Sequence, residues 1–258
     1  MGKRPDDIIT VDWGSFTGDA VTIPVCMSSP VARGRSLRGQ MEAIKPHIKD
    51  LTILICDSLD RHNRQDPEGI DRTACIMEGI QWKIQHLLII QEYYPDVKFI
   101  TWENDILTSP SFSRNLDAIR RLCDQSGAVQ ELRTSMSMFF LENKRRRFAR
   151  DLQRGKVSGC FDFGSALHSS TAYLEEELAG DMAYQELSEG KPYVYWGLYV
   201  DQIDLFTKES GQLMAFPQTL PVCSTRHGPS VRVSGLPHDR YRREVKALFS
   251  APKMRRSA

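Results

Sequence analysis

The sequence lacks the features that define several large classes of protein. No apolar run approaches the roughly 20 residues that cross a membrane as a helix. The first residues, Met-Gly-Lys-Arg-Pro-Asp-Asp, contain no apolar segment of the kind found in secretory signals. We therefore expect a cytoplasmic protein with no membrane partner.

Cysteine and histidine are few and scattered. The chain has six cysteines with no Cys-x-x-Cys pair and six histidines, and the two types share no metal-like spacing. With no signal segment visible, this pattern predicts reduced thiols and no metal site. Cys26 and Cys56 each end a hydrophobic run, which favours small buried side chains.

The short motifs of several common enzymes are also absent. The sequence has no Gly-x-Gly-x-x-Gly opening a helix, no Gly-Lys-Ser/Thr phosphate loop and no Gly-x-Ser-x-Gly elbow. We therefore expect no cofactor of those kinds. The formal net charge of +1 excludes a globally basic nucleic-acid binder but leaves room for a local basic face.

What is present is an alternation of strand and helix patterns. Strands are predicted at Val21–Met27, Leu51–Cys56, Val97–Trp102 and Tyr193–Val200. Helices are predicted at Arg35–Lys49, Ile70–Gln91, about Ser113–Cys123, about Ala128–Arg154 and Phe163–Leu187. This order predicts an α/β fold: a single Rossmann-like domain at 20–250, with a mainly parallel sheet flanked by helices. A polar arm at 1–19 and a flexible tail at 251–258 complete the expected organisation.

A pair of serines follows the first predicted strand. Ser28 and Ser29 stand just before a proline-containing loop and a helix, which would place a hydroxyl at the carboxyl edge of the sheet. Successive strand residues point to opposite faces, so only one of the two can face a pocket there. The same residues also suit an ordinary turn.

A phenol and a carboxylate share one face of the last predicted helix. Tyr173 and Glu177 are four residues apart, a spacing that brings their side chains together. Such a pair can hold an ammonium group and accept its proton. The alternative is a solvated acidic face, because Glu175 and Glu176 are neighbours.

A dense basic run ends the helix before it. Seven of the thirteen residues from 144 to 156 are basic: Lys144, Arg145, Arg146, Arg147, Arg150, Arg154 and Lys156. The run suits binding to phosphate backbones, where each contact releases counterions. It also suits a salt-bridged surface helix whose positive end lies at the favourable terminus of the helix dipole.

In this order, the elements resemble those of the tRNA-dependent cyclodipeptide synthases. The resemblance covers roughly residues 20–206, and the matching segments are Cys26-Met27-Ser28, Ile55-Cys56-Asp57, Phe99–Ile106 and Tyr173–Leu178. The chain departs from the bacterial pattern at Val31. None of its late-strand tyrosines (Tyr193, Tyr195 and Tyr199) is followed by His or Pro. It therefore resembles a divergent member, similar to the fungal group that makes arginine-containing cyclodipeptides.

The resemblance implies a fold like the catalytic domain of class I aminoacyl-tRNA synthetases and an aminoacyltransferase of secondary metabolism. Two aminoacyl-tRNAs would form a 2,5-diketopiperazine by a ping-pong route through an aminoacyl-serine and a dipeptidyl-enzyme. Ser28 would carry the acyl group, Tyr173 and Glu177 would hold the ammonium, and Tyr199, preferred over Tyr195, would relay a proton. The six basic residues from Lys144 to Arg154 would dock tRNA.

An arginyl substrate would need a carboxylate partner, since an unpaired buried charge is unfavourable. The candidates near predicted strand ends are Asp57, Glu103, Asp105, Asp201 and Asp204, and Cys26 is expected to line the substrate site. Two other functions stay open. One is a Rossmann-like nucleotide- or cofactor-binding transferase in which the serines contact phosphate at a helix N-terminus. The other is a non-catalytic tRNA-binding module.

Overall fold

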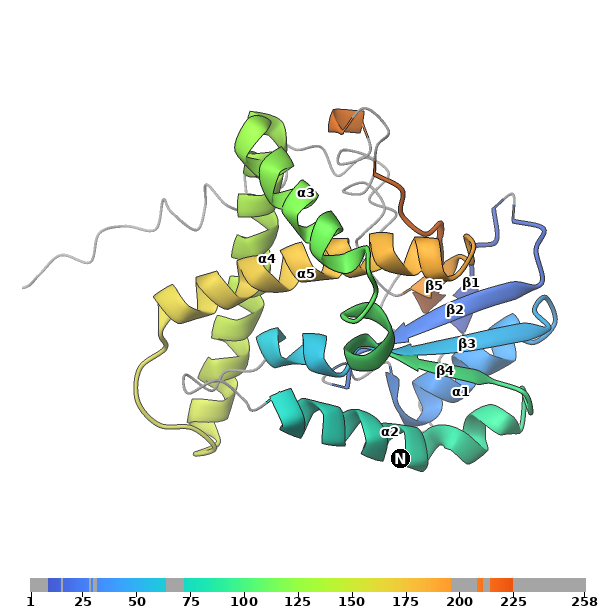
Figure 1. The fold of residues 1–258 in the computed structure, drawn as a ribbon. Helices are drawn as coiled ribbons and strands as arrows, with labels where there is room; N and C mark the ends of the chain where they lie inside the picture. Colours follow the sequence, from blue (N-terminus) through green and yellow to red (C-terminus); the bar gives the residue numbers. More distant parts are fainter. Residues whose placement is uncertain are drawn as a thin grey trace, which may run out of the picture.

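The computed structural model describes residues 9–14, 16–27, 29, 32–63, 72–195, 208–210 and 214–224 (Figure 1). The strands are β1 (Ile9–Val11), β2 (Ala20–Val25), β3 (Asp50–Ile55), β4 (Lys98–Thr101), β5 (Tyr193–Tyr195) and β6 (Thr219–Ser224). The α-helices are α1 (Gly34–Ile44), α2 (Arg72–Gln91), α3 (Phe112–Gln125), α4 (Gly127–Gln153) and α5 (Phe163–Leu187). A 3₁₀-helix, η2 (Ser58–Asn63), follows β3, and a π-helix, η3 (Trp102–Ile106), follows β4.

The strands form one sheet in the order β1-β6-β5-β2-β3-β4. Each neighbouring pair is parallel except β1 and β6, which pair antiparallel. The predicted mainly parallel sheet is therefore confirmed. Among the other five strands, β2 is central. The chain adds β3 and β4 on one side of β2 and then returns to add β5 and β6 on the other side, as in the Rossmann arrangement.

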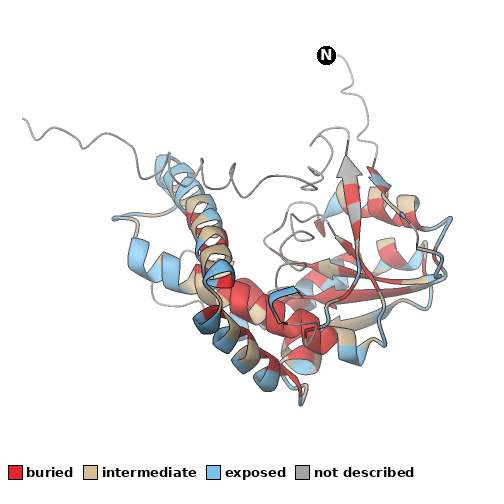
Figure 2. Cartoon of the chain, turned by 90° about the horizontal axis from the view of Figure 1, so that it is seen from above, coloured by how far each residue is buried: buried red, intermediate tan, exposed pale blue. Residues whose placement is uncertain are grey.

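Helices cover both faces of this sheet. Figure 1 shows α1 and α2 on one face and α5 on the other, with α3 and α4 packed against α5. Helix α1 lies on the sheet because Leu37, Met41 and Ile44 form one apolar stripe. Buried residues gather in the sheet and in the part of α5 that lies over it (Figure 2).

The two-residue period of the strands divides the interior into two cores. On β3, Ile53 and Ile55 belong to the core under α1 and α2, whereas Leu54 and Cys56 belong to the core under α5. Both faces of the strand are buried, so β3 has the continuous apolar sequence typical of a central parallel strand.

The boundaries differ from the predictions in several places. Helix α1 ends at Ile44 rather than Lys49, because Pro46 has no backbone N–H to continue the helical hydrogen bonds. Of the strand predicted at Tyr193–Val200, the structure has Tyr193–Tyr195, and 196–200 lie outside the described residues.

Four elements were not predicted: β1, β6, the 3₁₀-helix η2 and the π-helix η3. Strand β1 lies in the region expected to be an arm, where buried Ile9 and Val11 flank exposed Thr10. The predicted domain limits remain a prediction, as does the tail, which lies outside the described residues. Among the helices that the structure describes, none combines the length and apolarity of a membrane span.

Candidate active site

The strand order places a ligand site at the carboxyl ends of β2 and β5. Helix α1 leaves β2 toward one face of the sheet, whereas α5 reaches β5 from the other. Where the order of a parallel sheet reverses in this way, the connections diverge and leave a crevice at the strand ends.

A small cavity lies at this edge, between the sheet and α5. The lining residues come from strands β2, β3 and β5 and the positions just after them, from α5, and from the short helices η2 and η3. They are Pro24, Cys26, Leu54, Cys56, Leu59, Trp102, Glu177, Asp181, Tyr193 and Tyr195. Its free space is about 20 Å³, enough for one water molecule. None of these residues is basic, although two are carboxylates.

Helix α5 carries the functional side chains to the cavity. The helix begins with Asp162, whose carboxylate accepts the backbone N–H of Ser165 at 3.1 Å. At Gly180, a Cβ atom would lie 2.1 Å from the Trp102 ring, so only glycine permits this approach of α5 to η3. This close packing places Glu177 and Asp181, one turn apart, over the strand ends.

Glu177 is buried among phenols rather than cations. The hydroxyl of Tyr173 donates to Glu177 Oε1 at 2.9 Å, and that of Tyr195 lies 3.5 Å from the same oxygen. Burial, reinforced by the charge of Asp181, raises the pKa of Glu177 to about 8, and the hydrogen bonds from the two tyrosines oppose this rise. Burial and the nearby Glu177 likewise raise the pKa of Tyr173 and of Tyr195.

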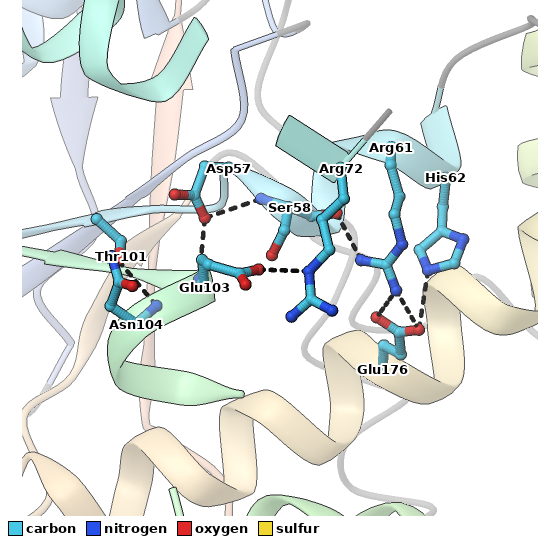
Figure 3. Close-up of polar contacts among 9 residues, drawn as sticks. All are labelled: Asp57, Ser58, Arg61, His62, Arg72, Thr101, Glu103, Asn104 and Glu176. Carbon is cyan, nitrogen blue, oxygen red and sulfur yellow. Dashed lines mark hydrogen bonds and ion pairs between the residues drawn. The ribbon is translucent and has the colours of Figure 1, made fainter. Parts of the chain in front are cut away.

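The two preceding glutamates have cationic partners. Glu175 contacts Arg120 at 2.9 Å and Arg133 at 3.0 Å, linking α5 to α3 and α4. Glu176 receives two 2.7 Å bonds from Arg61 Nη2 and lies 3.0 Å from His62 Nε2 (Figure 3). Although burial acts in the opposite direction, these partners hold the pKa of Glu176 below its usual value. The alternative of a solvated acidic face is therefore wrong for this segment.

The acidic residues after β3 and β4 form a separate cluster beside the cavity. Asp57 Oδ1 accepts the backbone N–H groups of Ser58 at 2.8 Å and Glu103 at 3.0 Å, and Arg72 Nε donates to Glu103 Oε2 at 2.7 Å (Figure 3). Burial raises the pKa of Asp57. For Glu103, the bonds from Arg72 and Ser58 outweigh burial and lower the pKa.

Neither of these two predicted substrate residues lines the cavity. Asp57 follows Cys56 in the chain, so its side chain points to the opposite face, away from α5 and toward α2. A Cβ atom added at Gly79 of α2 would lie 2.8 Å from the Cβ of Asp57. Glu103 turns outward to Arg72 at the start of α2. Asp105 accepts the N–H of Thr101 at 2.7 Å. Cys26, by contrast, lines the cavity, and its contact with substrate stays a prediction.

The remaining predicted residues at this site cannot be placed. Ser28, Tyr199, Asp201 and Asp204 lie outside the described residues. Among the late-strand tyrosines that the structure describes, Tyr195, less favoured from the sequence, has its hydroxyl near Glu177. Asp181 was missed, although its spacing of four from Glu177 on a recognised helix was a usable signal.

The basic run on α4 is exposed except at its first residue. Lys144 is buried against α5, where its Nζ donates to Ser169 Oγ at 2.7 Å, and burial, with the charge of Arg147, lowers its pKa to about 8. Lys144 therefore does not belong to the exposed basic surface, contrary to the prediction. The reason is helical geometry, since this position faces α5 while the neighbouring arginines face outward.

The arginines of this run differ in their contacts. Arg145 and Arg146 both pair with Glu142, at 2.7 and 2.8 Å. The guanidinium of Arg147 donates to the carbonyl of Asn63 at 3.3 Å. Arg146, Arg150 and Arg154, spaced by four, are exposed along one side of the helix.

Solved structures with this arrangement of elements share one description. A cyclodipeptide synthase from Fluoribacter dumoffii superposes with a TM-score of 0.70 at 15% identity, over 85% of this chain and 99% of the other. This chain has the cyclodipeptide synthase fold. The synthase from Candidatus Glomeribacter gigasporarum, bound to Phe-tRNAPhe, gives 0.54 at 17% identity over 79% and 86%.

The synthase fold also has a wider relationship. A Mycobacterium tuberculosis protein, whose structure relates cyclodipeptide synthetases to type I tRNA synthetases, gives a TM-score of 0.53 at 11% identity over 80% and 85%. The predicted fold class is thus confirmed. No protein-family model and no curated protein matches the sequence. Within the described residues, no group of three or more His, Cys, Asp or Glu side chains is arranged to hold a metal ion.

Proposed function

We propose that this chain is an aminoacyltransferase that joins the aminoacyl groups of two aminoacyl-tRNAs into a cyclodipeptide. The observation that carries this proposal is Glu177, a buried carboxylate with a raised pKa that two phenols surround at the switch point of the sheet. The synthase fold supports the same activity, and one solved structure with this fold is bound to Phe-tRNAPhe.

The reaction requires a nucleophile, and Ser28 is two residues beyond cavity-lining Cys26 in the chain. Its oxygen attacks the ester carbonyl of the first aminoacyl-tRNA, and the ribose hydroxyl of the tRNA leaves. The amine of a second aminoacyl-tRNA then attacks the aminoacyl-serine, which forms the peptide bond, releases the serine hydroxyl and leaves a dipeptidyl-tRNA. The serine hydroxyl attacks the ester of this dipeptidyl-tRNA, so a dipeptidyl-serine forms and the second tRNA leaves. Attack by the free amine on the new serine ester closes the ring and releases the serine hydroxyl. Covalent storage divides one difficult transfer into easier steps.

Tyr173 and Glu177 hold the ammonium group of the bound amino acid. An incoming cation favours the ionised carboxylate, so substrate binding displaces the proton that Glu177 retains in its apolar surroundings. Glu177 can therefore accept the ammonium proton and leave a nucleophilic amine.

Tyr195 is the residue best placed to pass this proton onward, because its hydroxyl lies 3.5 Å from Glu177 Oε1. Tyr199, favoured from the sequence, keeps its predicted role as an alternative relay. The exposed arginines of α4 supply the docking surface for tRNA phosphates, with Lys144 excluded by burial.

One of the two joined residues is arginine in this proposal. A cavity with two carboxylates and no basic residue among those lining it suits a substrate with two positive charges. Glu177 accepts the α-ammonium, and Asp181 supplies the carboxylate for the guanidinium. Asp181 replaces Asp57, Glu103 and Asp105 in this role because it lines the cavity and those three do not.

Covalent labelling tests the function. The protein is incubated with aminoacyl-tRNA labelled in the amino acid and precipitated with acid, and the products are searched by mass spectrometry for diketopiperazines. We expect label on the wild type and on Ser29→Ala but none on Ser28→Ala. A nucleotide- or cofactor-dependent transferase would leave all three unlabelled, and a binding module would retain tRNA in a salt-dependent manner without product. Label on Ser28→Ala but not on Ser29→Ala would overturn the assignment of the nucleophile.

A further inference from the structure

Two thiols face each other at the carboxyl ends of the central strands. Val25 of β2 and Ile55 of β3 are in register, and the ladder continues through the bond from Cys56 N to Val25 O at 2.8 Å. Cys26 and Cys56 therefore follow paired positions on adjacent parallel strands.

The spacing of these positions suits a disulfide. Adjacent strands lie about 4.8 Å apart, and disulfide-linked Cα atoms are usually about 4.4–6.8 Å apart. Both side chains line the same cavity. The two cysteines therefore lie side by side in the cavity wall.

We propose that Cys26 and Cys56 form an oxidisable thiol pair in the wall of the active-site cavity, and that a peroxide converts them to a disulfide. Cys26 is partly exposed and Cys56 is buried, so the oxidant reaches Cys26 first. The neighbouring Cys26 thiol and burial also raise the pKa of the Cys56 thiol, which disfavours Cys56 as the thiol that attacks the peroxide first.

The chemistry balances with hydrogen peroxide as the oxidant. The Cys26 sulfur attacks one peroxide oxygen, the O–O bond breaks, and the products are a sulfenic acid and water. The Cys56 sulfur then attacks the sulfenic sulfur, an S–S bond forms, and a second water leaves. The two thiols together lose two electrons, which reduce one peroxide to two waters.

The consequence for catalysis rests on the proposed function. Cys26 is two residues before Ser28 in the chain, and both sulfurs border the cavity that contains Glu177. A covalent link between β2 and β3 at this point fixes the cavity wall and occupies space needed by substrate. Oxidation should therefore reduce aminoacyl transfer, and a dithiol reductant should restore it.

Peptide mapping tests the pair without reference to activity. The reduced full-length protein is treated with graded hydrogen peroxide, its remaining thiols are alkylated, and tryptic peptides are analysed without reduction. We expect a linked product joining the Cys26 peptide to residues 50–61, which contain Cys56. It should persist in Cys160→Ser, which removes an exposed thiol, and be absent from Cys56→Ser.

Two results would overturn the thiol pair. One is recovery of Cys26 and Cys56 as separately alkylated residues after Cys160 has been fully oxidised. The other is over-oxidation of Cys26 while Cys56 remains a thiol. Because mapping in the wild type is decisive, the test stands even if Cys56→Ser does not fold.

Activity provides the second readout. In protein that makes the diketopiperazine, the lost fraction of transfer should equal the linked fraction and return with dithiothreitol. A linked product with full activity would overturn the inhibitory effect. Linkage in protein that forms no acyl-enzyme before oxidation would instead support the thiol pair and count against the proposed function.

Discussion

Glu176 and Glu177 are adjacent on α5, yet they lie in opposite electrostatic surroundings. Glu176 points to the polar cluster of η2, where Arg61 donates two hydrogen bonds to it and His62 lies 3.0 Å away (Figure 3). Glu177 points into the cavity at the strand ends, where its neighbours are Tyr173, Tyr195 and Asp181. The pKa is lowered at the first carboxyl and raised at the second.

This difference separates a structural carboxylate from a reactive one. A buried charge is normally paired, and Glu175 and Glu176 follow that rule by joining α5 to α3, α4 and η2. Glu177 has only neutral donors and another carboxylate among the contacts described above. Its site is unfavourable for the empty protein and suited to a cationic substrate, which is the usual relation between stability and function at a binding site.

The largest expected effect is on catalysis at Glu177. Glu177→Gln keeps the size of the side chain and an acceptor for Tyr173 but removes the ionisable group. We expect the rate of diketopiperazine formation to fall by roughly 10²–10⁴, the range typical of general acid–base groups. Rates are measured with saturating aminoacyl-tRNA in a single turnover.

The control for this variant is Glu186→Gln on the same helix. Glu186 is half-exposed and pairs with Arg114 at 3.0 Å, a contact worth about 0–1 kcal/mol. Its loss should leave the rate near that of the wild type. A Glu177→Gln enzyme as active as Glu186→Gln would remove the distinction between reactive and structural carboxylates.

The next effect is on stability at Glu176. Arg61→Met leaves the Glu176 carboxylate, whose side chain is 15% exposed, without its bidentate partner. We expect the free energy of unfolding to fall by roughly 2–3 kcal/mol, below the range for fully buried pairs because both groups retain some solvent contact. Urea unfolding provides the measurement. The double variant Arg61→Met/Glu176→Gln should recover part of the lost stability. Glu177→Gln should be at least as stable as Arg61→Met.

The pH dependence of stability should distinguish the two carboxyls by sign. From the ordinary pKa of 4.5 up to about 8, folded Glu177 keeps a proton that the unfolded chain has lost. Its contribution to stability is thus full below about pH 4.5 and declines by up to about 1.4 kcal/mol per pH unit as pH rises to about 8. Glu177→Gln should flatten this decline.

Glu176 should act on the opposite limb, because its folded pKa is lowered. Its contribution is present above the unfolded pKa and is lost as pH falls through the folded value. Urea titrations of wild type, Glu176→Gln and Glu177→Gln from acid to mildly alkaline pH check both signs. Parallel curves for the two variants would show that their surroundings do not differ.

The sequence predicted the architecture better than the surroundings of these residues. Period-two and helical patterns were long enough to identify β2, β3 and α5, and the Tyr173–Glu177 pair followed from a spacing of four. The ion pairs of Glu175 and Glu176 could not be predicted from spacing, because their partners come from α3, α4 and η2, which are distant in sequence.

Local rules failed where tertiary packing decides the structure. The three residues of β1 are too few for a recognisable strand pattern, and they form a strand by pairing with distant β6. Lys144 is part of a basic run in the sequence, yet its position on α4 faces α5. Asp57 ends a predicted strand, but the alternation of β3 directs it away from the cavity that Cys56 lines.

The smallest effect is expected at Glu103, which lies in the polar cluster beside the cavity and tests the difference between the two. Glu103 has a cationic partner in Arg72, whose side chain is 53% exposed, so Glu103→Gln should lower the free energy of unfolding by only about 0.2–1 kcal/mol. Because it lies outside the cavity, its loss should not change KM for arginyl-tRNA. Asp181→Asn, within the cavity, should raise that KM and leave KM for an uncharged aminoacyl-tRNA less affected. If Glu103→Gln instead causes the arginine-specific change and Asp181→Asn does not, the polar cluster would be the recognition site and the cavity carboxylate would not.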